Sequence, residues 1–179
     1  FNYKELRKYL IADAADENSK HDFGMNIIPS MLADKKKLYA WTFDGYWKDV
    51  GTVESLWQAN MDLLDDKELD LYNIKKDWKI YSEDTLGKPQ LIGAQASVKN
   101  SLVTQGCVVN GEVEGSVLFS NVNVGEGAKV IDSVLMPGVL VEEGAVVKKA
   151  IIDEGVVIKA GTVVNEEAEE VALVSGNSR

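Results

Sequence analysis

An octapeptide at residues 45–52, GYWKDVGT, gathers two aromatic rings, an amine and a carboxylate between two glycines. Loops that only connect elements consist mostly of Gly, Pro, Asn, Asp and Ser, so Trp47, Lys48 and Asp49 suggest a further role. Mg²⁺ usually takes one or two carboxylates together with substrate phosphates, and a metal role for Asp49 would therefore need a second carboxylate. Two structural interpretations of these residues fit the spacing about as well as a functional site does. Asp49 could complement the dipole of a following helix, and the two rings could cover the edge of a sheet.

The residues around this loop predict a strand before it and a helix after it. LYAWTF (38–43) has the aromatic residues typical of strands. Thr52 is a good N-cap for a helix from Val53 to about Leu64, in which Leu56, Ala59 and Leu63 line one face. This order of elements is that of α/β proteins, whose ligands bind where strands end. Asp49 is therefore expected at such a position.

The residues further upstream predict two more helices. Residues 3–15 carry an apolar stripe at helical spacing, with charged residues between its members. Asp22 is suited to capping a turn, and Pro29 suits the first turn of a helix that runs to about Asp34.

The second half of the chain contains a repeat. Four segments align without gaps: NSLVTQGCVV (100–109), GSVLFSNVNV (115–124), DSVLMPGVLV (132–141) and KAIIDEGVVI (149–158). In each, a small residue precedes two apolar ones, and a second apolar pair follows near the end. The apolar spacing of about two and the many β-branched residues argue against helices. Short apolar units broken by glycine predict a coil of three short strands per turn that stacks as a β-helix. The repeat resembles the left-handed parallel β-helix built on hexapeptides, and that resemblance alone implies the handedness.

A β-helix can also be an enzyme, and the acyltransferases of this fold use a His as general base. The only histidine here is His21, far upstream of the first coil. Cys107 occupies an apolar position of the repeat, so we interpret it as a core residue. An acyltransferase is therefore disfavoured, and the β-helix is interpreted as an assembly or regulatory platform.

The composition limits the partners. Charged residues make up 27% of the chain and the net charge is -10, with the cations dispersed among the acids. A nucleic-acid interface needs a clustered basic face, so none is expected. No apolar run approaches the roughly 18 residues that span a bilayer, so no membrane partner is expected. A single cysteine fits a reducing cytoplasm.

GYWKDVGTVESLWQANMDLL (45–64), preceded by HDFGMNIIP (21–29) and followed by LDLY (69–72), resembles bacterial glucose-1-phosphate adenylyltransferase, or ADP-glucose pyrophosphorylase. The resemblance implies the α/β remnant of a Rossmann-like nucleotidyltransferase domain, followed by the left-handed parallel β-helix. The expected boundaries are 1–66 for the nucleotidyltransferase part, 67–88 for a linker, 89–165 for the β-helix and 166–179 for a tail.

The resemblance also implies roles for particular residues. Asp49 matches the family aspartate that helps bind the catalytic Mg²⁺. Asp22, Phe23 and Trp47 match residues that line the glucose 1-phosphate pocket. Lys48 has no implied role, and we interpret it as a solvated side chain. The family also implies ATP as the second substrate and a homotetramer, or a heterotetramer with a related subunit.

Residues 1–44 lack the family's glycine-rich phosphate-binding loop. We therefore expect a fragment that is inactive by itself, although its parent is an enzyme of glycogen synthesis. Two related alternatives stay open: a regulatory subunit that has lost active-site residues, and a nucleotidyltransferase for another sugar phosphate. The intact GYWKDVGT loop favours a catalytic chain over a regulatory one.

Overall fold

The computed structural model describes residues 1–65 and 86–176. The chain divides into two compact units, Phe1–Gly45 and Tyr46–Arg179, and each is described by itself. Most of the segment that the sequence analysis assigned to a linker, 67–88, lies outside the described residues.

The first unit consists of short helices. Helix α1 (Tyr3–Ala14) begins where the Asn2 side chain accepts hydrogen bonds from the backbone N–H groups of Lys4 and Glu5. A single π-helical turn, η1 (Phe23–Ile27), leads directly into α2 (Ile28–Ala33), which has Pro29 in its first turn. The predicted helices at 3–15 and 29–34 are therefore present, within one residue at each end.

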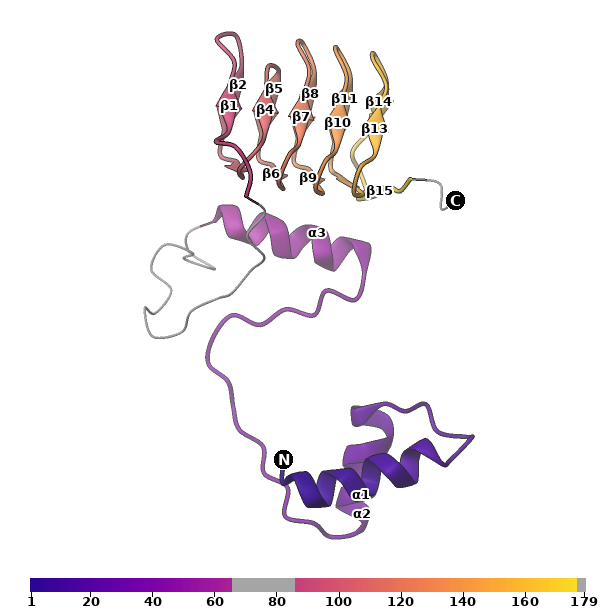
Figure 1. Ribbon diagram of the computed structural model, residues 1–179. Helices are drawn as coiled ribbons and strands as arrows, with labels where there is room; N and C mark the ends of the chain where they lie inside the picture. Colours follow the sequence, from indigo (N-terminus) through magenta and orange to yellow (C-terminus); the bar gives the residue numbers. More distant parts are fainter. Residues whose placement is uncertain (66–85, 177–179) are drawn as a thin grey trace. The chain divides into compact units, whose positions relative to one another are not determined.

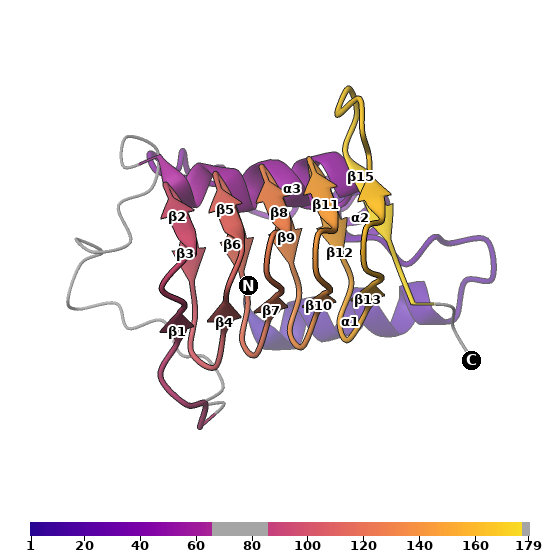
Figure 2. The ribbon, with the colours of Figure 1, turned by 90° about the horizontal axis from the view of Figure 1, so that it is seen from above.

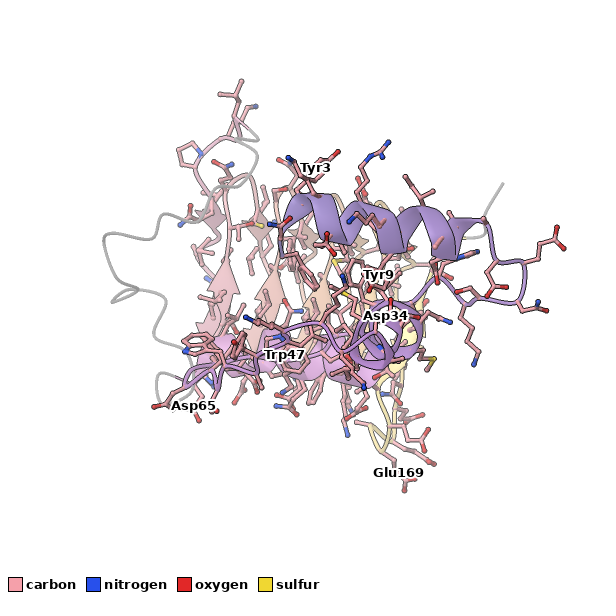
Figure 3. The ribbon with its side chains drawn as sticks, turned by 90° about the horizontal axis from the view of Figure 1, so that it is seen from below. Tyr3, Tyr9, Asp34, Trp47, Asp65 and Glu169 are labelled. Atoms are coloured by element: carbon pink, nitrogen blue, oxygen red, sulfur yellow. The ribbon has the colours of Figure 1, made fainter. Side chains whose placement is uncertain are left out.

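Polar contacts hold α1 against the end of α2. The Tyr9 hydroxyl donates to Asp34 Oδ2 at 2.6 Å, and Figure 3 shows these two side chains meeting. Glu5 accepts from Lys36 at 2.8 Å and from Lys8 at 2.7 Å, and these two ammonium groups lower the pKa of Glu5 to about 2. Ile27 and Met31 supply the buried apolar contacts of the unit.

The strand predicted at 38–43 is not formed, and that expectation was wrong. These residues have no regular secondary structure, and Tyr39 and Trp41 are 87% and 81% exposed. A strand is stable only when a neighbouring strand pairs with its backbone, and the described part of this unit, residues 1–45, supplies none. The aromatic composition was therefore an insufficient signal.

The second unit begins with the GYWKDVGT loop and helix α3 (Val53–Met61), which ends in a 3₁₀ turn, η2 (Asp62–Leu64). Thr52 caps α3 as predicted. Its hydroxyl accepts from the Ser55 backbone N–H at 3.1 Å, and the Ser55 hydroxyl accepts from the Thr52 N–H at 3.0 Å. This reciprocal pair satisfies two backbone donors that a helix start leaves open.

Residues 91–174 form a parallel β-helix, in which successive short strands belong to three different sheets (Figures 1 and 2). The first sheet contains β1 (Leu91–Ile92), β4 (Val108–Val109), β7 (Asn123–Val124), β10 (Leu140–Val141) and β13 (Val157–Ile158). The second contains β2 (Ser97–Lys99), β5 (Glu112–Glu114), β8 (Lys129–Ile131), β11 (Val146–Lys148) and β14 (Val163–Val164). The third contains β3 (Leu102–Val103), β6 (Val117–Leu118), β9 (Val134–Leu135), β12 (Ala150–Ile152) and β15 (Ala172–Val174).

The pairing places equivalent positions of the repeat on top of one another. Val109, Val124, Val141 and Ile158 are consecutive partners along the first sheet and lie inside the coil. Each coil therefore buries its apolar positions on the coil before and after it, as the repeat predicts. Cys107 is fully buried in the same core, which confirms its interpretation as a core residue.

One corner of the coil explains the first two positions of the repeat. Asn100, Gly115, Asp132 and Lys149, the first residues of the four segments, all have positive φ, between 41° and 57°. The second position carries a ladder of hydroxyls. Ser101 Oγ accepts from the Ser116 N–H at 3.1 Å, Ser116 Oγ from the Ser133 N–H at 3.0 Å, and Ser133 Oγ from the Ala150 N–H at 3.2 Å.

The segment expected as a tail, 166–179, also contributes to the coil. Ala172–Val174 form β15, which pairs in parallel with β12 and extends the third sheet. The sequence analysis missed this strand because ALV falls outside the regular repeat, after the acidic run NEEAEE. Between β14 and β15, Asn165 Nδ2 donates hydrogen bonds to the backbone oxygens of Lys149 at 3.0 Å and Glu170 at 2.8 Å.

Candidate functional site

The side chains of the GYWKDVGT loop differ in their exposure. Tyr46 and Lys48 are half-buried, whereas Trp47 is 76% exposed and Asp49 is also exposed. Asp49 Oδ1 accepts from the Gly51 backbone N–H at 3.1 Å, which fixes one carboxylate oxygen within the loop. The ring of Trp47 and the carboxylate of Asp49 are thus both accessible to solvent.

The two half-buried side chains are fastened to the end of α3 by one carboxylate. Asp62 Oδ2 accepts from the Tyr46 hydroxyl at 2.9 Å and from Lys48 Nζ at 2.6 Å. Gln58 Nε2 donates to the other oxygen, Oδ1, at 2.9 Å. The interpretation of Lys48 as a solvated side chain was wrong, because 29% of this side chain is exposed and its amine is paired with Asp62.

The environment of Asp62 favours its charged form. Burial by itself would raise the pKa of this carboxyl group, but the hydrogen bonds from Lys48, Gln58 and Tyr46 outweigh burial and hold the pKa below its usual value. A carboxylate that accepts several hydrogen bonds is stabilised as an anion. Asp62 therefore stays ionised and keeps both of its loop partners at neutral pH.

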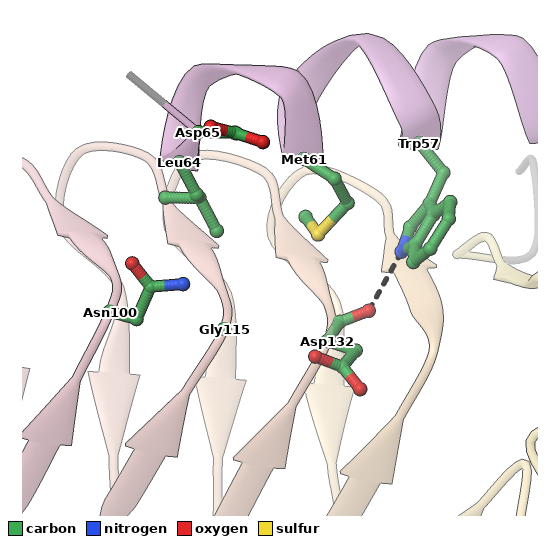
Figure 4. A pocket seen from close by; sticks show the side chains of 7 residues that line it. All are labelled: Trp57, Met61, Leu64, Asp65, Asn100, Gly115 and Asp132. Atoms are coloured by element: carbon green, nitrogen blue, oxygen red, sulfur yellow. Dashed lines mark hydrogen bonds between the residues drawn. The ribbon is translucent and has the colours of Figure 1, made fainter. Parts of the chain in front are cut away.

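The opposite side of α3 rests on the corner of the β-helix. Trp57 Nε1 donates to the Asp132 backbone oxygen at 2.7 Å, and Lys149 Nζ lies 5.6 Å from the centre of the Trp57 ring. A groove of about 480 Å³ follows this contact (Figure 4). It is lined by Trp57, Met61, Leu64, Asp65, Asn100, Gly115 and Asp132.

Two further predicted site residues lie in the first unit. Asp22 caps η1, with Oδ1 accepting from the Met25 N–H at 2.7 Å, as the sequence suggested. Phe23 is 43% exposed, and its ring meets the edge of Phe1 with the centroids 5.8 Å apart. His21 Nδ1 lies 2.8 Å from Asp13 Oδ2, so the HDFG segment is tied to the end of α1.

The four predicted site residues therefore form two local pairs, Asp22 with Phe23 and Trp47 with Asp49, one in each unit. Within residues 1–65 and 86–176, no group of three His, Cys, Asp or Glu side chains converges on a metal position. Asp49 by itself fits the role of a single carboxylate ligand to Mg²⁺, a cation that commonly completes its shell with water and substrate phosphates.

The two parts of the chain are each similar to known protein families. Residues 1–66 match the family described as nucleotidyl transferase, and residues 90–173 match the family described as GlmU-like, C-terminal hexapeptide. A glucose-1-phosphate adenylyltransferase of Clostridium beijerinckii is 56% identical over 133 residues, which is 74% of this chain and 34% of the relative. The chain resembles the glucose-1-phosphate adenylyltransferases.

Two other glucose-1-phosphate adenylyltransferases are similar to this chain to a comparable degree. The glucose-1-phosphate adenylyltransferase of Clostridium novyi is 58% identical over 126 residues, covering 70% of this chain and 32% of the relative. That of Fusobacterium nucleatum is 49% identical over 133 residues, covering 74% and 34%. The chain thus spans about a third of the length of these adenylyltransferases. The expected resemblance and fold class, a part of a nucleotidyltransferase domain followed by a left-handed β-helix of hexapeptides, are confirmed.

Sequence reasoning missed Asp62 and Trp57. Both follow the loop closely, and their spacing offered a signal: Gln58 and Asp62 are four residues apart, as are Trp57 and Met61, so each pair shares one side of the helix. The predicted face of Leu56, Ala59 and Leu63 did not include the residues that line the groove.

No helix in the described part of the chain is long and apolar enough to cross a bilayer.

Proposed function

We propose that this chain is the sugar-phosphate side of a glucose-1-phosphate adenylyltransferase. The reaction joins glucose 1-phosphate to the α-phosphate of ATP and releases pyrophosphate, giving ADP-glucose for glycogen synthesis. The observation that carries the proposal is the exposed pair of Trp47 and Asp49 on a loop that Asp62 fastens to α3. The similarity of the chain to enzymes of that name supports it.

The side chains suit a sugar phosphate. The exposed faces of Trp47 and Phe23 offer apolar surfaces on which a pyranose ring packs. Asp22 Oδ1 is engaged with the Met25 N–H, and we assign its Oδ2 to the hydroxyls of the sugar. In each unit by itself, these side chains are assigned to binding glucose 1-phosphate, whose phosphate oxygen is the nucleophile. Holding two reactants in the right geometry is itself a large part of such catalysis.

We assign Asp49 as a ligand of the catalytic Mg²⁺. The Gly51 N–H holds its Oδ1 within the loop, and the Asp49 side chain is exposed to solvent. A bound Mg²⁺ would neutralise the charge that develops on the phosphate oxygens during transfer. The nearby Lys48 is committed to Asp62 and is not assigned to a phosphate.

The nucleotide-binding part is assigned to residues outside this sequence. Residues 1–44 contain one glycine, Gly24, and so cannot form a G-x-G-x-x phosphate loop. We therefore expect the isolated chain, supplied with ATP, glucose 1-phosphate and Mg²⁺, to make no ADP-glucose above a blank without protein. Formation of ADP-glucose by the purified chain would contradict this part of the proposal.

A chimera tests the function directly. The residues of the Clostridium beijerinckii relative that match this chain are replaced by those of this chain, and the formation of ADP-glucose is measured. We expect an active chimera whose Asp49→Asn variant loses at least about a hundredfold in kcat, the scale at which removing one charge-stabilising group acts. Glu54→Gln, an exposed acid in the first turn of α3, is the matched control. A folded but inactive chimera, or an active Asp49→Asn variant, would refute the assignment.

The proposal extends to the assembly and location of the protein. The β-helix is assigned to subunit assembly, in a homotetramer or a heterotetramer with a related chain. Leu91, Ile92 and Val157 on its first sheet are 59%, 44% and 42% exposed, which favours a partner surface.

The only cysteine is buried, which fits a cytoplasmic protein without disulfides. Acyl transfer by the coils stays disfavoured, because residues 86–179 contain no histidine to act as a base.

A further inference from the structure

The carboxylate of Asp62, which lies outside the GYWKDVGT loop, binds two residues of that loop. Tyr46 and Lys48 bind Asp62 at the end of α3, whereas Trp47 and Asp49, which directly follow them, are exposed. The four residues are consecutive, so holding Tyr46 and Lys48 on Asp62 restricts the directions in which Trp47 and Asp49 can point.

Asp62 makes both of these attachments through the same atom. Its Oδ2 accepts from Tyr46 and from Lys48, and its Oδ1 is held by Gln58 one helical turn earlier. Only 12% of the Asp62 side chain and 29% of the Lys48 side chain are exposed, so the pair is protected from water. Partly buried pairs are screened by salt much less than exposed ones. This attachment is stronger than the surface pairs of the chain, such as Lys129 with Glu112, in which 53% and 36% of the side chains are exposed.

The helix that carries Asp62 is itself fixed. Its other side is docked on the β-helix through the hydrogen bond from Trp57 to Asp132 and through the ring contact with Lys149. Thr52 and Ser55 cap its start, directly after the loop. Asp62 therefore attaches the loop to helix α3, whose first turn is capped and whose side facing the β-helix is docked.

We propose that Asp62 is a positioning residue of the adenylyltransferase site: by binding Tyr46 and Lys48 together, it holds Trp47 and Asp49 toward the sugar phosphate. This inference rests on the proposed function for its meaning, but the attachment itself can be tested without a substrate. It also assigns Lys48 a task within the loop, in place of a phosphate contact.

The test follows the Trp47 ring in the 179-residue chain labelled with 5-fluorotryptophan. The ¹⁹F resonances of Trp47 and Trp57 are assigned from the Trp47→Phe and Trp57→Phe variants. In Asp62→Asn we expect the Trp47 resonance to shift and the Trp57 resonance to stay in place, because the loop is released while α3 remains docked. Glu54→Gln removes an exposed acid from the same helix and should move neither resonance.

A second variant separates positioning from a general loss of structure. Lys48→Met keeps the aliphatic chain and removes the amine that binds Asp62. If Asp62 acts through Lys48, this variant shifts the Trp47 resonance in the same direction, and the double variant adds little to either single change. Should Asp62→Asn disturb the fold of α3, the Trp57 resonance reports it, and Lys48→Met then decides the question.

An unchanged Trp47 resonance in both Asp62→Asn and Lys48→Met would overturn the proposal. A shift of Trp47 together with Trp57 in both variants would also overturn it, because Asp62 would then stabilise the helix and not the loop. The consequence for the reaction is measured in the chimera, where Asp62→Asn should raise the KM for glucose 1-phosphate about tenfold and leave the KM for ATP unchanged. A chimera that is inactive with Asp62 intact refutes the proposed function and leaves the ¹⁹F result valid.

Discussion

The indole Nε1 of Trp57 donates a hydrogen bond to the backbone oxygen of Asp132 at 2.7 Å, across 75 positions of the sequence. Asp132 is one of the corner residues with positive φ that begin each repeat. The contact therefore joins the helix after the GYWKDVGT loop to the framework of the β-helix.

Trp57→Phe should weaken the docking of α3. The variant loses the hydrogen bond to Asp132, worth about 0.5–1.5 kcal/mol, and part of the attraction between the ring and Lys149. We expect the free energy of unfolding of the 179-residue chain, measured by urea denaturation, to fall by about 1–2 kcal/mol. Trp41→Phe is the control, because Trp41 is 81% exposed. Equal midpoints for the two variants would contradict the docking role.

Ser116→Ala and Ser133→Ala should each destabilise the β-helix. Both hydroxyls are fully buried, and each accepts the N–H of the equivalent residue in the next coil. Removing the acceptor leaves a buried donor without a partner, at a cost of about 1–3 kcal/mol. Ser97→Ala, in a half-buried strand position, should have a smaller effect. Thermal unfolding followed by circular dichroism checks the order, and an equal loss in all three variants would refute the ladder.

Cys107 should resist modification until the coil unfolds. Burial raises the pKa of its thiol, although hydrogen bonds around the sulfur act in the opposite direction, and its Sγ donates to the Phe119 oxygen at 3.0 Å. A thiol-specific disulfide reagent should therefore react only as fast as the protein opens, and quickly in urea. A stoichiometric reaction of the native protein within the mixing time would place Cys107 outside the core.

The same pKa predicts an alkaline loss of stability. A group whose pKa is raised on folding contributes stability that is complete below its unfolded pKa and is lost as the pH rises through the folded pKa. The urea midpoint should therefore fall as the pH rises above about 8.5, the ordinary pKa of a thiol. Cys107→Ala should remove this part of the pH dependence, and an identical slope in the variant would exclude Cys107 as its source.

The chain should form at least a dimer. Among residues 86–176 no further strand pairs with the two ends of the coil, and the first sheet exposes aliphatic side chains; both surfaces need a cover. Sedimentation velocity over a range of protein concentrations measures the mass. A single monomeric species at every concentration would contradict the assignment of the β-helix to assembly.

The repeat was readable because each coil is one local unit stacked on the next. A small residue followed by two apolar ones, at a regular interval, can bury its apolar positions only against a copy of itself. The helices at 3–15 and 53–64 were readable for a similar reason, since their caps and apolar positions lie within a few residues of one another. The strand at 38–43 was not formed, because strand formation depends on a partner and not on composition.

The candidate site divides in the same way. The sequence by itself determined that Trp47 and Asp49 share one loop and that Thr52 starts a helix after it, since capping and loop chemistry are local. Only the tertiary structure decided that Lys48 is paired with Asp62 and that Trp57 reaches Asp132, because these contacts depend on how α3 folds back on the loop and against the coil. The direction of each side chain in the loop follows from those distant partners, and the free energy of such contacts exists only once the chain has brought them together.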